Sequence, residues 1–314
     1  MYPGPAFELP ARAALRPEGL FLELRDIGPG ELQDPFLQHT VQRVPARASV
    51  VQIRRRDVLG APADVAPAGI IFHVGRCGST LVSQLLKQQG QVVVYAEPLA
   101  VNEILVPPQP WSRAELVGAL RTLGGFFARH AGQPWVLKLS SWNTLYCDVV
   151  TEAFPSAPWA LCVRDPVEVC VSLLERRPGW LRDAGEPSHR FAAVVDPQRS
   201  SQSVAEYLAR LNAACCRAIG RLDLARGTLI PYETLPDAVW DTLAARFGLR
   251  VDDAARARML LAARSDSKAG VGATEVFVPD GARKRTASPL ALRQAVDALA
   301  RPELERLAAR FAAR

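Results

Sequence analysis

Residues 69–90 read GIIFHVGRCGSTLVSQLLKQQG, and the rest of the chain is organised around this stretch. It opens with an apolar run over residues 70–74, which has the length of one buried strand. A tight turn follows, in which Gly75 and Gly78 permit positive φ angles and close approach of the backbone. From Ser79 onwards, apolar residues recur at helical spacing. The stretch therefore predicts a strand, a glycine turn and a helix.

This geometry favours the binding of an anion. The turn aims several unpaired backbone N–H groups at one point, where the helix dipole also favours negative charge. Arg76 adds a permanent cation, and Ser79 and Thr80 add hydroxyl donors. We expect a cradle for a phosphate or sulfate group, formed by Gly75, Arg76, Cys77, Gly78, Ser79 and Thr80. The alternative is an ordinary strand-to-helix turn of a parallel sheet.

The turn is not a standard nucleoside-triphosphatase loop, which has four residues between two glycines and then Lys followed by Ser or Thr. Here Gly75 and Gly78 are too close together, and no lysine precedes Ser79 or Thr80.

The composition is that of a globular protein. The chain has 314 residues, 49% of them hydrophobic and 22% charged, which suits one large domain or one domain with an attachment. The net charge of +6 and the pI of about 9.2 are modest, and they do not by themselves indicate nucleic acid as a partner. No window reaches the ~20 uninterrupted apolar residues of a membrane span.

The remaining global signals favour a cytoplasmic protein. The first fifteen residues, MYPGPAFELPARAAL, show no basic region followed by an apolar core, so we expect no secretory signal. The six cysteines lack metal-type spacing, and reduced thiols are the simplest account of them. We expect neither a bound metal nor a membrane as partner.

The first part of the chain differs from the rest. Residues 1–66 are rich in Pro and Arg and hold short strand-like pieces at 21–24 and 48–53, and residues 61–69 read as a linker. We expect a small N-terminal subdomain or lid over residues 1–66 and an α/β domain over residues 67–314.

Strands and helices alternate after the opening unit. Further buried strands are predicted at residues 91–97, 135–142, 159–165 and 228–233, separated by helical patterns. This alternation predicts a three-layer αβα architecture with a central, mainly parallel five-stranded sheet of the P-loop type.

Three charged residues lie where predicted strands end. Glu97 precedes Pro98, which ends the second strand, Lys138 interrupts the third apolar run, and Arg164 follows the fourth. In a parallel sheet the carboxyl ends of the strands form the edge where ligands bind, so we expect Glu97 near Arg76. Lys138 is expected either at the end of its strand or facing a polar site, because a buried unpaired ammonium is costly. The alternative for Glu97 is a surface glutamate at the start of a loop.

The fourth unit predicts a second anion site. Asp165 is suited to the N-cap of the next helix, Pro166 to its first position, and Glu168 to completing a capping box. Ser172 lies about two turns on and can face the same side as Arg164. The alternative is a helix cap with an incidental arginine.

Two further stretches read as loops. Residues 176–199 are polar and have the character of a lid or substrate-binding segment. Residues 265–285 are glycine-rich and end in a basic cluster, which suits either closure over an anionic cofactor or a mobile surface loop.

Three of these motifs, in this order, resemble those of sulfotransferases that use 3′-phosphoadenosine 5′-phosphosulfate (PAPS): GRCGST at 75–80, YAEP at 95–98 and VRDPVEVCVSL at 163–173. The resemblance covers residues 69 to about 290. It implies that the glycine turn holds the 5′-phosphosulfate and that Arg164 and Ser172, eight residues apart, hold the 3′-phosphate. Further basic contacts implied for the C-terminal loop fall on Lys268, Lys284 and Arg285.

The resemblance also implies catalytic roles for Glu97, Arg76 and Lys138. Aryl and steroid members of the family carry a histidine base two residues after the strand lysine, but here Ser140 occupies that position. Some carbohydrate and protein-tyrosine members use a glutamate after the second strand, which Glu97 matches. Glu97 would take the acceptor proton with a pKa raised by burial, Arg76 would neutralise developing charge, and Lys138 would assist the leaving oxygen.

Under this interpretation PAPS is the donor, the adenosine bisphosphate (PAP) is the product and no metal is needed. The acceptor is a hydroxyl or amine of a small molecule, carbohydrate or peptide, and the oligomeric state cannot be read. Two alternatives stay open. One is a P-loop nucleotide kinase or NTPase, in which Asp165 would hold the metal. The other is a non-catalytic nucleotide-binding protein of the same fold.

Overall fold

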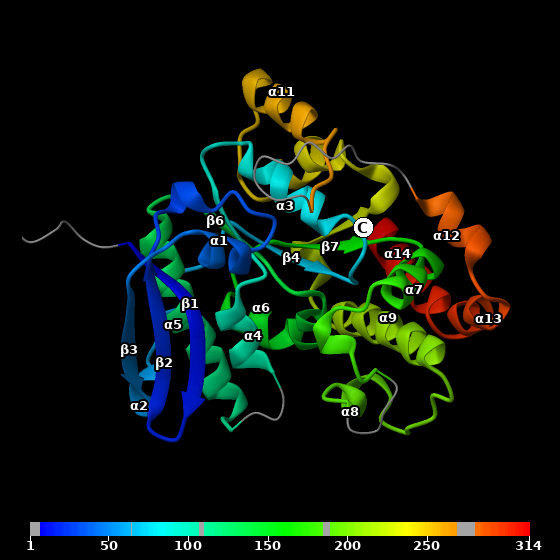
Figure 1. Cartoon of the computed structure of the whole chain (residues 1–314), viewed down its shortest axis with the longest axis horizontal. Coiled ribbons are helices and arrows are strands. Elements are labelled where there is room, and N and C mark those ends of the chain that lie inside the picture. Colours follow the sequence, from blue (N-terminus) through cyan, green and yellow to red (C-terminus); the bar gives the residue numbers. More distant parts are fainter. Residues whose placement is uncertain (1–6, 64, 107–109, 185–188, 269–279) are drawn as a thin grey trace, which may run out of the picture.

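Five parallel strands form the central sheet, in the order β5–β6–β4–β7–β8 (Figure 1). Their bounds in the computed structural model are β4 (Gly69–His73), β5 (Val93–Ala96), β6 (Trp135–Lys138), β7 (Trp159–Val163) and β8 (Gly227–Pro231). The structure describes residues 7–63, 65–106, 110–184, 189–268 and 280–314. The predicted five-stranded parallel sheet is confirmed. Because β4 is central and later strands add on either side of it, the turn after β4 lies at the switch point of the sheet.

Helices cover both faces of this sheet, with α3 and α11 on one side and α6 and α9 on the other (Figure 1). The helices that follow β4 are α3 (Ser79–Lys87), α4 (Leu99–Leu105), α5 (Arg113–Ala131), α6 (Cys147–Ala153), α7 (Pro166–Glu175), α8 (Ala192–Val195) and α9 (Val204–Gly220). A π-helical turn, η6 (Val239–Leu243), then leads into α10 (Ala244–Arg246), α11 (Asp253–Ala262), α12 (Gly281–Ala287), α13 (Leu290–Leu299) and α14 (Arg301–Ala312). Short 3-10 turns are η1 (Pro29–Glu31), η2 (Ser141–Tyr146), η3 (Gly179–Leu181), η4 (Leu224–Arg226) and η5 (Tyr232–Thr234). The three-layer architecture is confirmed.

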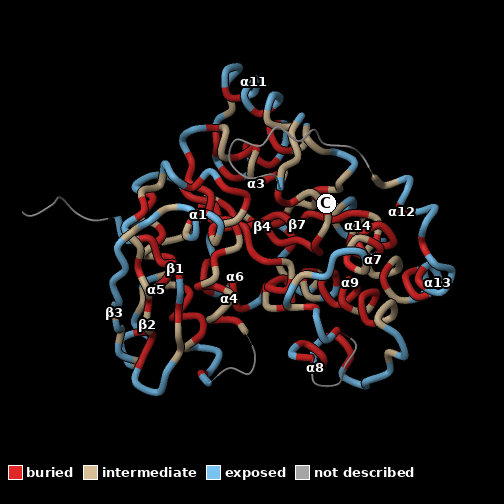
Figure 2. The backbone as a smooth tube through the Cα atoms, viewed as in Figure 1, coloured by how far each residue is buried: buried red, intermediate tan, exposed pale blue. Residues whose placement is uncertain are grey.

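The sheet is the centre of the core. All residues of β4, β5, β6 and β7 are buried, as expected for parallel strands covered on both faces, and the tube in Figure 2 is red through β4 and β7. The aromatic side chains of Phe72, Tyr95 and Trp159 are fully buried between the layers. The six cysteines are buried and free.

Local sequence signals placed most boundaries correctly. Ser112 and Glu115 form a capping box at the start of α5, in the Ser-x-x-Glu pattern typical of a helix N-terminus. The third strand is shorter than predicted, because β6 ends at Lys138 and η2 follows instead of more strand.

The prediction of a loop over residues 265–285 is wrong at its end, where α12 forms. Ion pairs to α7 hold this short helix: Arg283 binds Glu175, and Arg285 binds Glu168. Residues 269–279 of that predicted loop lie outside the described residues.

The N-terminal region forms a second, antiparallel sheet, which packs against two helices that flank the parallel sheet. It consists of β1 (Glu8–Arg16), β2 (Gly19–Asp26) and β3 (Ala48–Arg54), with α1 (Leu37–Arg43) and α2 (Arg55–Val58) beside them. Strand β1 lies against α4 and α5. Glu103 of α4 accepts hydrogen bonds from Nε of Arg12 at 2.5 Å and from the N–H of Ala13 at 2.6 Å. The buried leucines of this sheet, including Leu20 and Leu22, belong to the same apolar cluster as the parallel sheet.

Among the described residues, no helix combines the length and the apolar character that crossing a bilayer requires.

Candidate active site

The glycine turn after β4 adopts left-handed backbone geometry at three positions. The φ angles are +84° at Gly75, +53° at Arg76 and +81° at Gly78. A side chain at position 78 would also collide with its surroundings, since a Cβ there would lie 2.7 Å from Leu235 and 2.9 Å from Tyr232. The N–H groups of Cys77 and Gly78 have no hydrogen-bond partner among the described residues. The turn therefore has the predicted form of an anion cradle, and α3 begins directly after it at Ser79.

Arg76 brings an uncompensated positive charge to this cradle. Its Nη2 donates to the carbonyl oxygen of Arg176 at 2.5 Å, and it forms no ion pair with a carboxylate in the part of the chain that the structure describes. Burial, followed by the nearby charge of Arg176, lowers the pKa of Arg76. The pKa of Lys268 is lowered to about 8, by desolvation first and then by the charge of Arg76. The charge of Arg76 thus affects the pKa of Lys268, which comes from a distant segment.

Arg164 adjoins the turn from the next strand. It follows β7 directly, is buried, and donates from Nη1 to the carbonyl oxygen of Arg76 at 3.4 Å. Its guanidinium carbon lies 4.1 Å from the ring centroid of Tyr232, the same tyrosine that lies against Gly78. The glycine turn and the predicted second anion site are therefore neighbours.

Arg164 is already paired with two carboxylates. Nε donates to Oε2 of Glu168 at 2.6 Å, and Nη2 donates to Oδ1 of Asp280 at 3.1 Å. The prediction that Glu168 completes a capping box is wrong, because its second oxygen binds Arg285 instead. Asp165 caps α7 as predicted, accepting from the N–H groups of Val167 and Glu168.

Two other residues predicted for this second site, Lys284 and Ser172, lie near the carboxylates of Asp280 and Glu168. Lys284 is buried and donates to Oδ2 of Asp280 at 2.7 Å. Ser172 lies on α7 one turn beyond Glu168 and is half-buried. No side-chain contact between Ser172 and Arg164 is present among the described residues.

Glu97 lies at the carboxyl end of β5 with a φ of +53°, a conformation that non-glycine residues seldom adopt. Its N–H donates to the carbonyl oxygen of Lys138 at 2.7 Å, which extends the pairing of β5 with β6. Its side chain, which is 25% exposed, binds the ammonium group of the fully buried Lys138. Two predicted catalytic residues thus form one ion pair, in which Lys138 both ends β6 and faces a polar site.

Two further side chains hold the Glu97 carboxylate. The hydroxyl of Ser140 donates to Oε2 at 3.3 Å and itself accepts from Nδ2 of Asn102 at 3.0 Å. Nε2 of His73 lies 3.6 Å from Oε1. Burial acts to raise the pKa of Glu97, but the charge of Lys138 outweighs it, with help from His73, and lowers the pKa to about 2. The expectation of a raised pKa is therefore wrong, since it neglected the lysine.

His73 links three parts of the site. Its Nδ1 accepts from the N–H of Gly75 at 3.2 Å, and its Nε2 donates to the carbonyl oxygen of Leu139 at 2.8 Å. This pattern requires a neutral ring with its proton on Nε2. The sequence interpretation missed His73. Its one signal was a polar residue at the end of an otherwise apolar strand, just before the glycine turn.

Two other residues were also missed. The sequence shows Tyr232 only as an aromatic residue at the end of a strand. It shows Asp280 only as an acidic residue within a basic stretch. Neither signal is specific enough to predict a contact with Arg164.

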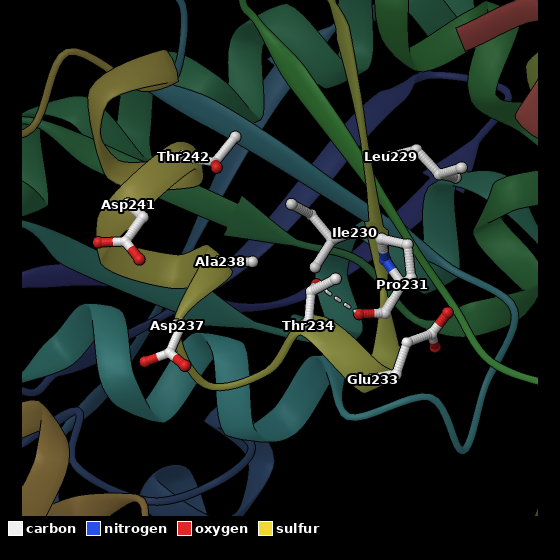
Figure 3. A pocket seen from close by; sticks show the side chains of 9 residues that line it. All are labelled: Leu229, Ile230, Pro231, Glu233, Thr234, Asp237, Ala238, Asp241 and Thr242. Carbon is white, nitrogen blue, oxygen red and sulfur yellow. Dashed lines mark hydrogen bonds between the residues drawn. The ribbon is translucent and has the colours of Figure 1, made fainter. Parts of the chain in front are cut away.

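Two cavities formed by described residues lie elsewhere. One, of about 420 Å³, lies beside the end of β8 and is lined by the acidic side chains of Glu233, Asp237 and Asp241 (Figure 3). The other, of about 530 Å³, lies near the C-terminal end of α5, around Phe7 and Arg129. Neither is lined by Arg76, and the acidic lining of the first disfavours a phosphate or sulfate ligand. The site is therefore identified by its side chains rather than by the size of a cavity.

The similarity to known proteins lies in the three-dimensional structure. No protein-family model and no curated protein matches the chain. Among solved structures, it is similar to the sulfotransferase domain of the olefin synthase of Synechococcus PCC 7002, with 17% identity, a TM-score of 0.49, and coverage of 77% of this chain and 96% of that one.

Two further solved structures have comparable values. A sulfotransferase from Alicyclobacillus acidocaldarius has 17% identity and a TM-score of 0.44, with 78% of this chain and 95% of that chain covered. A sulfotransferase from Mycobacterium tuberculosis H37Rv has 14% identity and a TM-score of 0.45, with 78% and 79% covered.

Proposed function

We propose that the chain is a sulfotransferase that moves a sulfuryl group from PAPS to a hydroxyl or amine acceptor. The observation that carries this proposal is the connection of two cationic sites, in which Arg164 donates to the backbone of Arg76 within the glycine turn. PAPS carries one anionic group at each of two positions of its ribose. Adjacent but separate anion sites suit such a ligand better than a single phosphate cradle does.

The glycine turn would hold the 5′-phosphosulfate. The residues assigned to it are Gly75, Arg76, Cys77, Gly78, Ser79 and Thr80. The free N–H groups of the turn supply directional donors, and Arg76 supplies a cation that no carboxylate neutralises among the described residues. Arg76 would neutralise the charge that grows on the transferred group, and Lys268 would add to the local positive potential.

The second site would hold the 3′-phosphate. Arg164 offers a planar set of donors that suits phosphate oxygens. Lys284 binds the same carboxylate as Arg164, that of Asp280, so its ammonium group lies beside the guanidinium. Ser172 and Arg285 are assigned to the same group as secondary contacts.

Glu97 would accept the proton of the acceptor. A carboxylate with a pKa of about 2 is fully ionised at neutral pH, although it is a weak base. The acceptor proton becomes strongly acidic as the new oxygen–sulfur bond forms, so a weak base is sufficient late in the transfer. Lys138 would keep Glu97 ionised, and the acceptor is proposed to be a small molecule, carbohydrate or peptide.

The kinase alternative is less well supported. The turn lacks the lysine of that class, and Asp165, the acid suited to a metal, caps α7 and accepts from Arg301 at 3.2 Å. A non-catalytic nucleotide-binding protein differs from the proposed enzyme only in turnover.

Calorimetric titration tests the donor. We expect PAP to bind without magnesium and more tightly than ATP with magnesium. Arg164→Ala is expected to weaken PAP binding about 10- to 100-fold, the range for a lost charged hydrogen bond, and to leave adenosine 5′-phosphate binding nearly unchanged. The matched control is Arg113→Ala, which removes an exposed arginine that binds Asp148 and Glu152. Equal losses for both nucleotides would contradict the assignment of Arg164.

Turnover with radiolabelled PAPS and a panel of hydroxyl and amine acceptors tests the chemistry. Glu97→Gln is expected to keep its affinity for PAP and to lose most activity, whereas Glu175→Gln is expected to keep both. Full activity of Glu97→Gln would remove this residue from the mechanism, and no transfer by the unaltered chain would favour the non-catalytic alternative.

A further inference from the structure

The two carboxylates that bind Arg164 differ in how firmly they are held. Glu168 is buried in the first turn of α7, four residues after Arg164, and binds Arg285 through its second oxygen. Gly281 lies close against it, because a Cβ at that position would be 2.8 Å from Oε2 of Glu168. Glu168 is therefore a fixed partner of Arg164.

Asp280 is held less firmly. Its side chain is 38% exposed, and it lies just before the short helix α12 rather than within a long element. Its bond to Arg164, at 3.1 Å, is longer than the 2.6 Å bond of Glu168. Of the two carboxylates, Asp280 is the one that a ligand can displace without opening the core.

The position of Asp280 matches what a phosphate would need. One carboxylate oxygen accepts from Arg164 and the other accepts from Lys284 at 2.7 Å, so a single anionic group bridges two buried cations. A phosphate monoester offers three oxygens and a charge of about −1.5 to −2 at pH 7, against −1 for a carboxylate. It can therefore replace Asp280 between the same two cations.

We propose that Asp280 is an internal competitor for the 3′-phosphate of the nucleotide, occupying Arg164 and Lys284 in the free protein and returning to them as the product leaves. This inference rests on the proposed function. It makes Asp280 a residue that weakens product binding and so hastens release. A nucleotide without the 3′-phosphate does not displace the Asp280 carboxylate, so its affinity does not depend on this residue.

The test compares PAP with adenosine 5′-phosphate by calorimetry. Asp280→Asn keeps an oxygen for Lys284 but removes the charge, and we expect it to bind PAP about 10-fold more tightly and adenosine 5′-phosphate equally well. Asp280→Glu, which restores the charge, is expected to return PAP affinity most of the way to that of the unaltered chain. The matched control is Glu175→Gln, which removes another ion pair between α12 and α7 without touching Arg164, and its PAP affinity should not change.

Unchanged or weaker PAP binding by Asp280→Asn would overturn the inference, and so would equal tightening by Glu175→Gln, since loosening of α12 would then be the cause. If PAP bound to neither the unaltered chain nor Asp280→Asn, the proposed function would fail and this inference with it.

Discussion

Nε2 of His73 lies 3.6 Å from Oε1 of Glu97 while the other nitrogen of the same ring accepts the N–H of Gly75. One buried imidazole therefore contacts both the predicted base and the predicted anion cradle. Its two hydrogen bonds hold the ring in one tautomer, so the positions of the glycine turn and of Glu97 depend on the same side chain.

Replacement of His73 should be costly for this reason. His73→Phe leaves the N–H of Gly75 and the carbonyl oxygen of Leu139 without their partner in a buried place. At about 1–3 kcal/mol for each of these two groups, we expect a loss of roughly 2–6 kcal/mol in the free energy of unfolding, measured by urea titration. The control is His39→Phe on the exposed side of α1, which should change little. A loss no larger than that of the control would show that these hydrogen bonds do not hold the site.

The pair of Glu97 and Lys138 should behave as a unit. Glu97→Gln leaves the fully buried ammonium of Lys138 without its counter-ion, and we expect a loss of about 3 kcal/mol in unfolding free energy at pH 7. The double variant with Lys138→Met should regain most of that loss, because no charge is then buried. Simple additivity of the two single changes would contradict the coupling. The exposed pair of Arg113 and Asp148 is the control, with an expected coupling below about 1 kcal/mol.

The pH dependence follows from the lowered pKa of Glu97. In the folded chain this pKa is about 2, against an ordinary value of 4.5. A lowered pKa contributes stability that is fully present above about pH 4.5 and is lost as the pH falls through about 2. We expect the difference in unfolding free energy between the unaltered chain and Glu97→Gln to be constant above pH 5 and to shrink below it. A difference that grew on acidification would mean that the pKa is raised.

Gly78→Ala tests the close packing of the turn. The left-handed φ of +81° costs any other residue about 1–2 kcal/mol, and the new Cβ would also meet Leu235 and Tyr232. Gly132→Ala shares the positive φ but has no atom within 4 Å of its Cβ, so it measures the backbone cost alone. We expect Gly78→Ala to be the more destabilising in thermal unfolding and to lose PAP binding. Equal effects of the two variants would argue against the observed packing of Tyr232.

The N-terminal sheet should unfold together with the parallel sheet. Leu22 is fully buried in the shared apolar cluster, and Leu22→Ala should cost about 2–5 kcal/mol. We expect calorimetry to show a single transition at a lower temperature. Val50→Ala, at a residue that is 68% exposed on β3, should change the stability by less than about 0.5 kcal/mol. Two separate transitions would support residues 1–66 as an independent subdomain.

Local patterns predicted much of the fold. The glycine turn, the capping box of Ser112 and Glu115, and the N-cap at Asp165 were predictable because each depends on neighbours within a few residues. Burial of the parallel strands was predictable from their continuous apolar runs.

The contacts between distant segments were not predictable in this way. Glu97 and Lys138 were each expected at the ligand edge, but their pairing, and with it the direction of the pKa shift, depends on the register of β5 against β6. The carboxylates on Arg164 come from α7 and from the residue before α12, and the helical form of α12 depends on ion pairs that the sequence alone does not reveal.

Helix α4 has a consequence for engineering. Two consecutive residues of this helix bind different parts of the structure. Asn102 donates a hydrogen bond to Ser140, which donates to the predicted base, whereas Glu103 accepts a hydrogen bond from the backbone of β1. A chimera that exchanged the N-terminal sheet for a foreign one would therefore need to bring its own version of this helix. Otherwise the graft would disturb the carboxylate of Glu97, the proposed base, without altering a single residue that touches it.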